Sequence, residues 1–269
     1  MQKTILITGA TDGIGLETAK LLVTAGHNVL IHGRTPSKLK AVEELLSSIG
    51  GAGKIHSYTS DLSYIADVEA LAVAISAEHS HLDVIINNAG VYTTPTTRTK
   101  DNLDVRFVVN TLSPYLLTQK LIHLLDSSGR VVNLSSAAQS PVDISALLGQ
   151  KALSDNAAYA QSKLAITMWS RHMADELGTN GPAVIAVNPA SFLGSKMVKE
   201  AYGVAGNDLS IGADILFRAA LSDEFANASG RYYDNDSKQF SAPHPDAENT
   251  SKNKELVQVI EKILTEKAI

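Results

Sequence analysis

A chain of 269 residues that is 44% hydrophobic can bury a large core, and we expect residues 1–269 to form a single domain. A net charge of −5, from 23 basic and 28 acidic residues, provides no positive stripe for nucleic acid, and the lack of cysteine excludes disulfides and thiolate catalysis. The start at Met1 has no signal-peptide pattern, and no apolar run approaches the roughly 18 residues of a membrane span. We therefore expect a cytoplasmic protein whose partners include neither nucleic acid nor membrane.

Short apolar runs alternate with longer amphipathic segments along the chain. Seven runs are predicted strands: Thr4–Thr8, Asn28–His32, Lys54–Tyr58, Val84–Asn87, Arg130–Leu134, Val184–Asn188 and Gly230–Tyr233. Most of them are too continuously apolar to be half-exposed. Helices between them are indicated by Pro36 near one start and by Gly129 and Gly178 after two ends. This order predicts an α/β fold: a doubly wound parallel sheet of about seven strands with helices on both faces, as in a Rossmann fold.

The first predicted strand leads into a glycine-rich turn and then into a helix that begins near Leu16. In this context Gly9 permits a tight turn, Gly13 the close approach of a pyrophosphate, and Gly15 close packing of helix on strand. The helix N-terminus adds N–H donors and positive potential. An ordinary glycine turn is the competing interpretation, because a glycine triple alone is weak evidence. The residues expected to contact a nucleotide here are Gly9, Thr11, Asp12, Gly13, Ile14 and Gly15.

The end of the second predicted strand indicates which nucleotide binds. It lies about 20 residues beyond the glycine turn, where the ribose 2′ position is recognised, and carries no acid. Arg34 and Thr35 instead offer a cation and a hydroxyl to a 2′-phosphate, so we expect NADP(H) to be favoured over NAD(H). The alternative is that Arg34 is a solvated residue that opens a helix. After the third strand, Asp61, followed by Leu62, is expected to accept a hydrogen bond from adenine, to cap a helix that starts near Ser63, or to do both.

Tyr159 and Lys163 lie four residues apart and therefore share one face of a predicted helix. An ammonium there favours the tyrosinate form, and lowering a phenol pKa by three units takes about 4 kcal/mol. A phenol tuned in this way can protonate a carbonyl oxygen under hydride attack or deprotonate an alcohol. The pair alone also fits a chance arrangement on a helix surface.

Together these motifs resemble the short-chain dehydrogenase/reductase family over essentially the whole chain. The matching residues stand in the family's order: Thr8–Gly15, Asp61-Leu62, Asn87–Gly90, Asn110, Ser135-Ser136, Tyr159–Lys163 and Asn188-Pro189. The resemblance implies hydride transfer between a nicotinamide and a carbonyl or alcohol substrate. It implies Tyr159 as the acid/base, Lys163 as the group that holds the nicotinamide ribose, Ser136 bonded to the substrate oxygen, and Asn110 ordering a proton-relay water. The further cofactor contacts that it implies are Asn88, Ala89, Gly90, Pro189 and Ser195, the last in place of a threonine that reaches the carboxamide.

Ser136 is preferred to Ser135 because the second serine aligns with the family's catalytic position, and we expect Ser135 to hold the loop. The interval from Ser136 to Tyr159 is longer than the family's usual dozen or so residues, and the extra residues fall in Pro141–Asn156. This resembles the retinol-dehydrogenase-like branch, which is too diverse to imply a retinoid substrate. A second departure is Pro189-Ala190, where the family usually has Pro-Gly.

The substrate side is expected to be closed by Ser191–Gly206 and by the insertion. Phe192, Met197 and Tyr202 suggest an apolar wall, although ordinary core packing explains them equally well. The eight histidines show no convincing spacing with carboxylates, so we expect no metal and interpret His79 and His81 as surface residues near a helix end.

Two other functions fit parts of the pattern. One is a regulatory protein that binds NADP(H) without chemistry, which the presence of Tyr159, Lys163 and Ser136 disfavours. The other is an enzyme of the epimerase or dehydratase branch, which the glycine spacing and the short C-terminal region disfavour.

Quaternary structure is open from the sequence alone. A homo-oligomer could use helices over Asp101–Leu125 and Asn156–Leu177. In Lys252–Lys267, apolar residues lie near one helical face, and they are expected to pack on the same domain or on a second subunit.

Overall fold

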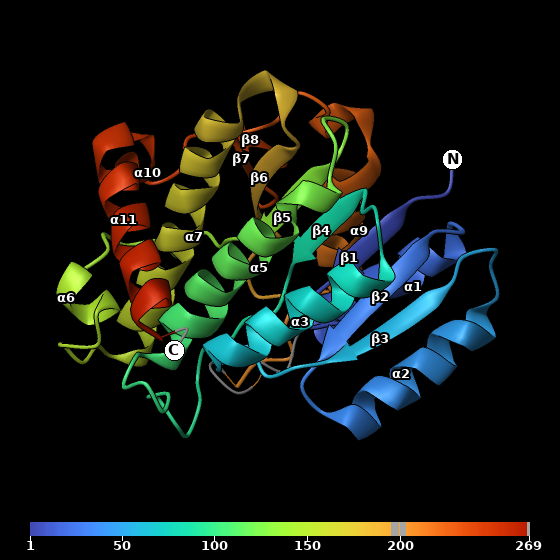
Figure 1. Cartoon of the computed structure of the whole chain (residues 1–269), viewed down its shortest axis with the longest axis horizontal. Helices are drawn as coiled ribbons and strands as arrows, with labels where there is room; N and C mark the ends of the chain where they lie inside the picture. The colour runs from blue at the N-terminus through green and yellow to red at the C-terminus, as the bar shows by residue number, and fades with distance from the viewer. Residues whose placement is uncertain (195–198, 200–202, 268–269) are drawn as a thin grey trace.

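Eight strands form one sheet in the order β3-β2-β1-β4-β5-β6-β7-β8 (Figure 1). The computed structural model describes residues 1–194, 199 and 203–267. The strands are β1 Thr4–Ile7, β2 Asn28–Gly33, β3 Ile55–Thr59, β4 Val84–Asn87, β5 Arg130–Leu134, β6 Ala183–Asn188, β7 Tyr232–Asp234 and β8 Gln239–Ser241. Strands β1 to β7 pair in parallel, and β8 is antiparallel to β7. The predicted doubly wound parallel sheet is confirmed, with one strand more than expected.

Two layers of helices cover the sheet (Figure 1). One layer contains α1 Gly13–Thr24, α2 Pro36–Ile49 and α9 Leu209–Leu221. The other contains α3 Ile65–Glu78, α5 Ser113–Leu121, α7 Asp155–Leu177, α10 Pro245–Glu248 and α11 Thr250–Lys267. Successive residues of a strand pack against opposite helix layers. Ile5 and Ile7 belong to the core under α1 and α9, and Leu6 belongs to the core under α3 and α5. Both strand faces are buried, which explains why the strands are continuously apolar.

Several short elements escaped the sequence prediction. They are α4 Val105–Phe107, a π-helical turn over Val108–Leu112, α6 Ile144–Leu147 inside the insertion, and three 3₁₀ turns at 122–124, 178–180 and 223–225. Strand β8 was missed because its three residues include only one apolar side chain. Two predicted helix starts were wrong by a few residues. Helix α1 begins at Gly13, not near Leu16, because the Asp12 carboxylate accepts the Gly13 N–H, and α3 begins at Ile65, not near Ser63.

The strand order places a crevice at one edge of the sheet. From β1 the chain proceeds outward through β2 and β3, and then crosses back to β4 on the other side of β1. The loops that leave the carboxyl ends of β1 and β4 therefore diverge, which is the usual ligand site of open α/β sheets. In the part of the chain that the structure describes, no helix combines the length and apolar character needed to cross a bilayer.

Candidate active site

A cavity of about 930 Å³ follows the carboxyl ends of β1 to β6. Every residue predicted to contact the cofactor borders this cavity, except Ser195, which lies outside the described residues. The wall runs from the glycine turn past Arg34 and Asp61 to Tyr159, Lys163 and Pro189. Residues that are more than 150 positions apart are thus brought to one continuous space.

The glycine turn has a backbone that side chains would obstruct. Gly9 and Gly13 have φ angles of +66° and +55°, in the left-handed region that favours glycine. A Cβ at Gly15 would lie 2.3 Å from the Gly9 oxygen. Asn88 braces the turn, because its Nδ2 donates to the Thr8 oxygen at 2.8 Å and to the Gly9 oxygen at 3.0 Å. The turn and the start of α1 therefore form a narrow backbone cradle that borders one end of the cavity.

His32 is a residue of this cradle that sequence reasoning missed. It is buried at the end of β2, where Nε2 donates to the Ser60 oxygen at 3.0 Å and Nδ1 accepts the Gly9 N–H at 3.3 Å. Burial lowers the pKa of His32 to about 4, so the ring is neutral at pH 7 and can accept. A histidine at a strand end carries no sequence signal for this role, which depends on three strands coming together.

Positive groups gather at the same end of the cavity as the glycine turn. A Cβ at Gly33 would lie 2.4 Å from Thr11 Cγ2, so glycine keeps the passage open. Arg34, Thr35 and Lys38 border the cavity at the start of α2, whose first turn contains no acid. Among the described residues neither Arg34 nor Lys38 has an ion-pair partner. Lys38 was not predicted, although its position one helical turn after Arg34 is a usable signal.

Asp61 does not cap helix α3 as expected, because that helix begins at Ile65 with Tyr64 as its N-cap, and Asp61 instead closes the turn before it. Its Oδ1 accepts the Ser63 N–H at 2.9 Å, while the residue also borders the cavity. Leu62 is buried and its carbonyl accepts the Ser113 hydroxyl at 2.6 Å. The contact with adenine therefore stays a prediction beside an observed local role.

Tyr159 and Lys163 project from neighbouring turns of α7 at the opposite end of the cavity. The Lys163 ammonium lies 5.7 Å from the centroid of the Tyr159 ring and donates to the Leu134 oxygen at 2.7 Å. Burial lowers the pKa of Lys163 to about 8, so the ammonium form still prevails at pH 7. The Tyr159 ring packs edge-on against Tyr92, with 4.7 Å between centroids. A phenol and a desolvated cation therefore share one end of the site.

The two serines after β5 have different surroundings. Ser135 is buried, and its hydroxyl contacts Thr167 Oγ1 at 2.6 Å and the Lys163 oxygen at 3.1 Å, which ties the loop to α7 as expected. Ser136 is half-buried, and its Oγ accepts the Ala138 N–H at 3.1 Å. Ser135 borders the cavity, whereas Ser136 is not part of its wall. The catalytic assignment of Ser136 stays a prediction.

Asn110 lies in the π-helical turn, fully buried beside the cavity but not in its wall. Its Oδ1 accepts the Val91 N–H at 2.8 Å, and Nδ2 donates to the Val91 oxygen and to Ser162 Oγ, both at 2.9 Å. The side chain thus fastens the segment after β4 to α7, and its role in ordering a water is untested.

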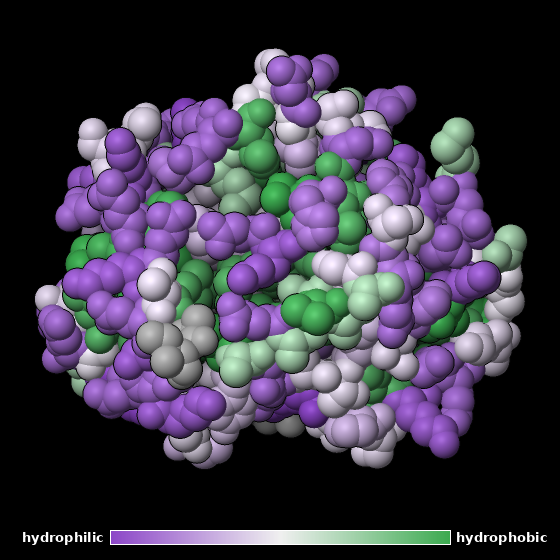
Figure 2. Space-filling view, in the orientation of Figure 1, coloured by the Kyte–Doolittle hydropathy of each residue, from purple (hydrophilic) through white to green (hydrophobic). Residues whose placement is uncertain are grey.

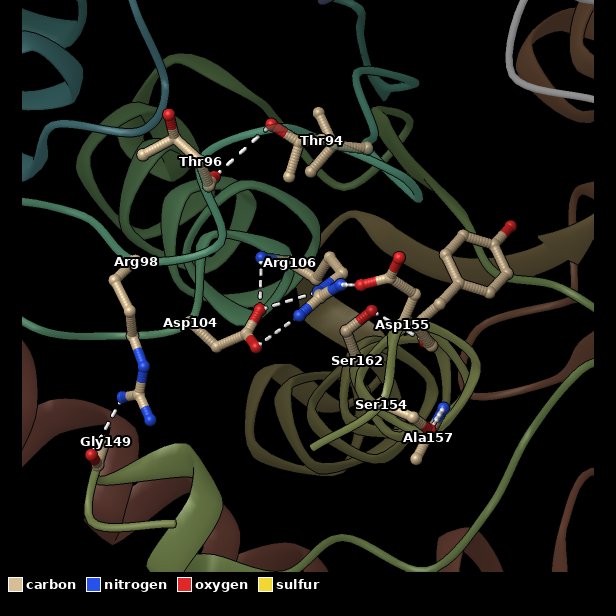
Figure 3. Close-up of polar contacts among 12 residues, drawn as sticks. Thr94, Thr96, Arg98, Asp104, Arg106, Gly149, Ser154, Asp155, Ala157 and Ser162 are labelled. Atoms are coloured by element: carbon tan, nitrogen blue, oxygen red, sulfur yellow. Dashed lines mark hydrogen bonds and ion pairs between the residues drawn. The ribbon is translucent and has the colours of Figure 1, made fainter. Parts of the chain in front are cut away.

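A buried arginine fastens the start of α7 to the same region. Arg106 forms a two-pronged pair with Asp104 at 2.6 and 2.8 Å, and its other nitrogen contacts Asp155 in the first turn of α7. Figure 3 shows the guanidinium between the two carboxylates. Because Asp155 precedes Tyr159 by one turn, this ion pair holds the helix that carries Tyr159.

The insertion is also packed against the cavity wall. Ala146 and Leu147 of α6 are buried in the core, and Arg98 Nη1 donates to the carbonyls of Asn102 and Gly149 at 2.7 and 2.8 Å. Part of the insertion is therefore a fixed brace for the 98–106 segment.

The segment after β6 shows the consequence of the missing glycine. Ala190 has a φ of +116°, a conformation in which a glycine would carry no Cβ penalty. Asp236 accepts both the N–H and the hydroxyl of the next residue, Ser191, at 2.8 and 2.6 Å. Phe192, one of the three residues proposed for an apolar wall, is 55% exposed, while Met197 and Tyr202 lie outside the described residues.

Comparison with known proteins gives consistent matches. Residues 3–203 match the short chain dehydrogenase family. Retinol dehydrogenase 13 from Homo sapiens is 30% identical over 266 residues, which cover 92% of this chain and 80% of that protein. An uncharacterized protein from Mycobacterium paratuberculosis has a crystal structure with a TM-score of 0.82 and 25% identity, covering 98% of this chain and 94% of that one. A metagenomic short-chain oxidoreductase in complex with NADP has a TM-score of 0.61 and 29% identity, covering 80% of this chain and 89% of that one.

Proposed function

The chain belongs to the short chain dehydrogenase family, and on this premise we propose that it is an NADP(H)-dependent oxidoreductase acting on a carbonyl or alcohol substrate. The observation that carries the proposal is one cavity with a glycine cradle and free cations at one end and the Tyr159–Lys163 pair at the other. Similarity to retinol dehydrogenase 13 agrees with the branch indicated by the long interval before Tyr159, while the substrate stays open.

The residues present fit a dinucleotide. The cradle formed by Gly9, Gly13 and Gly15 leaves space and N–H donors for a pyrophosphate at the start of α1. Gly33 leaves space for the adenosine ribose, and Asp61 offers a carboxylate to adenine. A cavity of about 930 Å³ is large enough for a nucleotide together with a small substrate. When bound, the nicotinamide supplies or accepts the hydride.

We place the 2′-phosphate between Arg34 and Lys38, with Thr35 as a hydroxyl donor. Both cations are exposed at the cavity rim, and among the described residues neither is neutralised by a carboxylate. The N-terminus of α2 adds positive potential. When NAD(H), which lacks the 2′-phosphate, is bound, these side chains remain in water with no loss of free energy. They therefore favour NADP(H) without excluding NAD(H).

At the other end, we propose that Tyr159 Oη donates a proton to the carbonyl oxygen during reduction and accepts one from the alcohol during oxidation. The Lys163 ammonium favours the tyrosinate form, and since one of its three donors bonds to the Leu134 oxygen, two are left for the cofactor ribose. Ser136 is proposed to bond the substrate oxygen, with Ser135 as its support.

The experiment is a titration of the protein with NADPH and NADH, followed by a carbonyl panel that includes all-trans-retinal. We expect tighter NADPH binding, and we expect Arg34→Ala to weaken it by about 10- to 100-fold with little effect on NADH. Lys40→Ala is the matched control, because Lys40 is an exposed cation of α2 outside the cavity.

Tyr159→Phe should retain NADPH binding and reduce turnover by at least about 10²-fold. Tighter binding of NADH would refute the cofactor preference. NADPH binding without turnover on a broad panel would instead favour a regulatory protein over an enzyme.

A further inference from the structure

A second cluster of chemically active side chains lies at the start of the edge strand β3, whereas the cavity lies at the carboxyl ends of the strands. His56 is on β3 and precedes Tyr58 by two residues, so both side chains are on the same face of the strand. Glu78 is the last residue of α3, and His79 follows it. Because β3 and α3 run in opposite directions, the start of the strand and the end of the helix meet there (Figure 1).

The cluster has the composition of a transition-metal site. One potential ligand atom each from His56, Glu78 and His79 lies within 4.8 Å of the other two. The two imidazole rings are 4.8 Å apart between centroids and nearly perpendicular, at 84°. Both histidines are half-buried, while Glu78 is exposed and can move. In a tetrahedral zinc site with bonds of about 2.0–2.1 Å the ligand atoms are about 3.3 Å apart, so closure brings them together by up to about 1.5 Å.

Tyr58 supports two of these ligands from the protein interior. Its hydroxyl is 2.7 Å from Glu78 Oε2 and 2.8 Å from His79 Nε2. A carboxylate can only accept, so the phenol donates to Glu78 and its oxygen accepts the His79 Nε2–H. This assignment leaves the lone pair on His79 Nδ1. Metal-bound histidines characteristically donate their other N–H to a supporting group, and here that group is in place.

The local electrostatics favour a cation as well. The carbonyl end of α3 and the Glu78 carboxylate supply negative potential to the same place.

We propose that His56, Glu78 and His79 bind one divalent transition-metal ion, Zn²⁺ in the first instance, with Tyr58 as the supporting group behind two of the ligands. Two imidazoles and one carboxylate suit Zn²⁺, whereas Mg²⁺ and Ca²⁺ prefer oxygen ligands. Three ligands leave one position for water. The ion would fasten edge strand β3 to the end of α3. It takes no part in the proposed hydride transfer, which takes place at the carboxyl ends of the strands.

The test uses protein without a histidine tag, stripped with EDTA and titrated with Zn²⁺ in competition with a chromophoric chelator. We expect one ion per chain, and binding at least about 10-fold weaker in His56→Ala and in His79→Ala. His81→Ala is the matched control, since His81 is an exposed histidine close to the cluster in sequence but outside it. Its binding should equal that of the wild type.

Tyr58→Phe separates a built site from two adventitious surface histidines. Loss of the hydroxyl should weaken Zn²⁺ binding by about 10- to 100-fold, because both supporting contacts disappear. Zn²⁺ should also raise the Tm of the wild type and not that of His56→Ala, and this comparison keeps the proposal testable if one variant is less stable. Absence of stoichiometric binding, or equal affinity in the wild type and both histidine variants, would overturn the proposal.

Discussion

The Lys163 ammonium lies where burial opposes its charge. Its pKa is lowered from 10.5 to about 8, and burial is the only cause that contributes. The difference of about 2.5 units corresponds to roughly 3 kcal/mol at pH values below 8, where the folded and the unfolded protein both carry the proton. Between pH 8 and 10.5 the unfolded state binds more protons, so the penalty on stability declines as pH rises through this window. The site therefore keeps its cation at the expense of the fold.

Lys163→Met should consequently be inactive and more stable. At pH 7 we expect the free energy of unfolding to rise by about 1–3 kcal/mol, since the lost bond to the Leu134 oxygen offsets part of the gain. The difference from the wild type should shrink towards pH 10. Urea unfolding at pH 7 and at pH 9.5, without cofactor, measures both effects, and Lys40→Met controls for loss of an exposed cation. A less stable Lys163→Met at pH 7 would show that burial does not penalise the ammonium.

Among single residues, those that belong to a sequence motif could be predicted, whereas those that act only through tertiary contacts could not. Gly15 and Tyr159 belong to patterns whose spacing reflects a local chemical need, so they could be found without a structure. His32 contacts Gly9 and Ser60 only because three strands are adjacent. The proposed metal ligands His56 and His79 are likewise 23 positions apart, and no short sequence spacing indicates that the start of a strand will meet the end of a helix.

Helix α7 is the element on which the proposed chemistry depends. Polar contacts at two places join it to the segment before α5: Arg106 contacts Asp155 in its first turn, and Asn110 and Thr111 contact Ser162 two turns later. Tyr159 lies between the two connections. Arg106 is fully buried, so its two carboxylate partners decide whether its charge is compensated.

Asp155→Asn should test whether the first connection positions Tyr159. Asparagine preserves the shape and removes the charge opposite Arg106, and we expect kcat to fall about 10-fold with an unchanged Kd for NADPH and a stability loss of about 1–2 kcal/mol. Asp214→Asn is the control, because Asp214 forms an exposed pair with Arg218 on α9. A purely structural ion pair would lower Tm and leave kcat per folded molecule unchanged, and that result would contradict the positioning role.

Strands could be predicted from the sequence where both of their faces are buried. The parallel strands could be recognised because both faces are covered, which leaves a continuous apolar run. Strand β8, at the edge, lacks that signal. Helix α6, within the proposed insertion, was missed, since four residues held by the Asp143 cap and by two buried side chains have no periodicity to detect.

For the whole molecule, the position of α11 decides between the two arrangements that the sequence left open. The helix packs along α7, with its apolar face (Leu256, Val257, Ile260, Ile263 and Leu264) buried in the core. Glu261 of α11 accepts the hydroxyl of Tyr115 on α5 at 2.9 Å. The expected packing of this segment on its own domain is therefore observed. The helices considered for an oligomer interface are, over much of their length, already covered by their own chain.

Strand order, by contrast, could not be derived from the apolar runs themselves. The runs are chemically alike, and the order 3-2-1-4-5-6-7 follows only from the resemblance to a family and from the right-handed crossovers of parallel strands. The crevice between β1 and β4 is a consequence of that strand order. Arg34 and Tyr159 border the same cavity for the same reason.

The cover provided by α11 predicts a monomer of 28.6 kDa in light scattering at micromolar concentration. Figure 2 shows mostly hydrophilic residues on the face that includes α3, α5 and α11, with the hydrophobic ones in separate patches, which does not favour a large apolar interface there.

Ile260→Asp places a charge in the core beneath α11, so it should lower the free energy of unfolding by about 3–5 kcal/mol. The helix should then be released, and dimers or aggregates should form through the uncovered surface of α5 and α7. Lys254→Asp, at an exposed position of the same helix, should remain monomeric. A wild-type dimer would contradict the prediction, and its persistence in Ile260→Asp would place the interface away from α5 and α7.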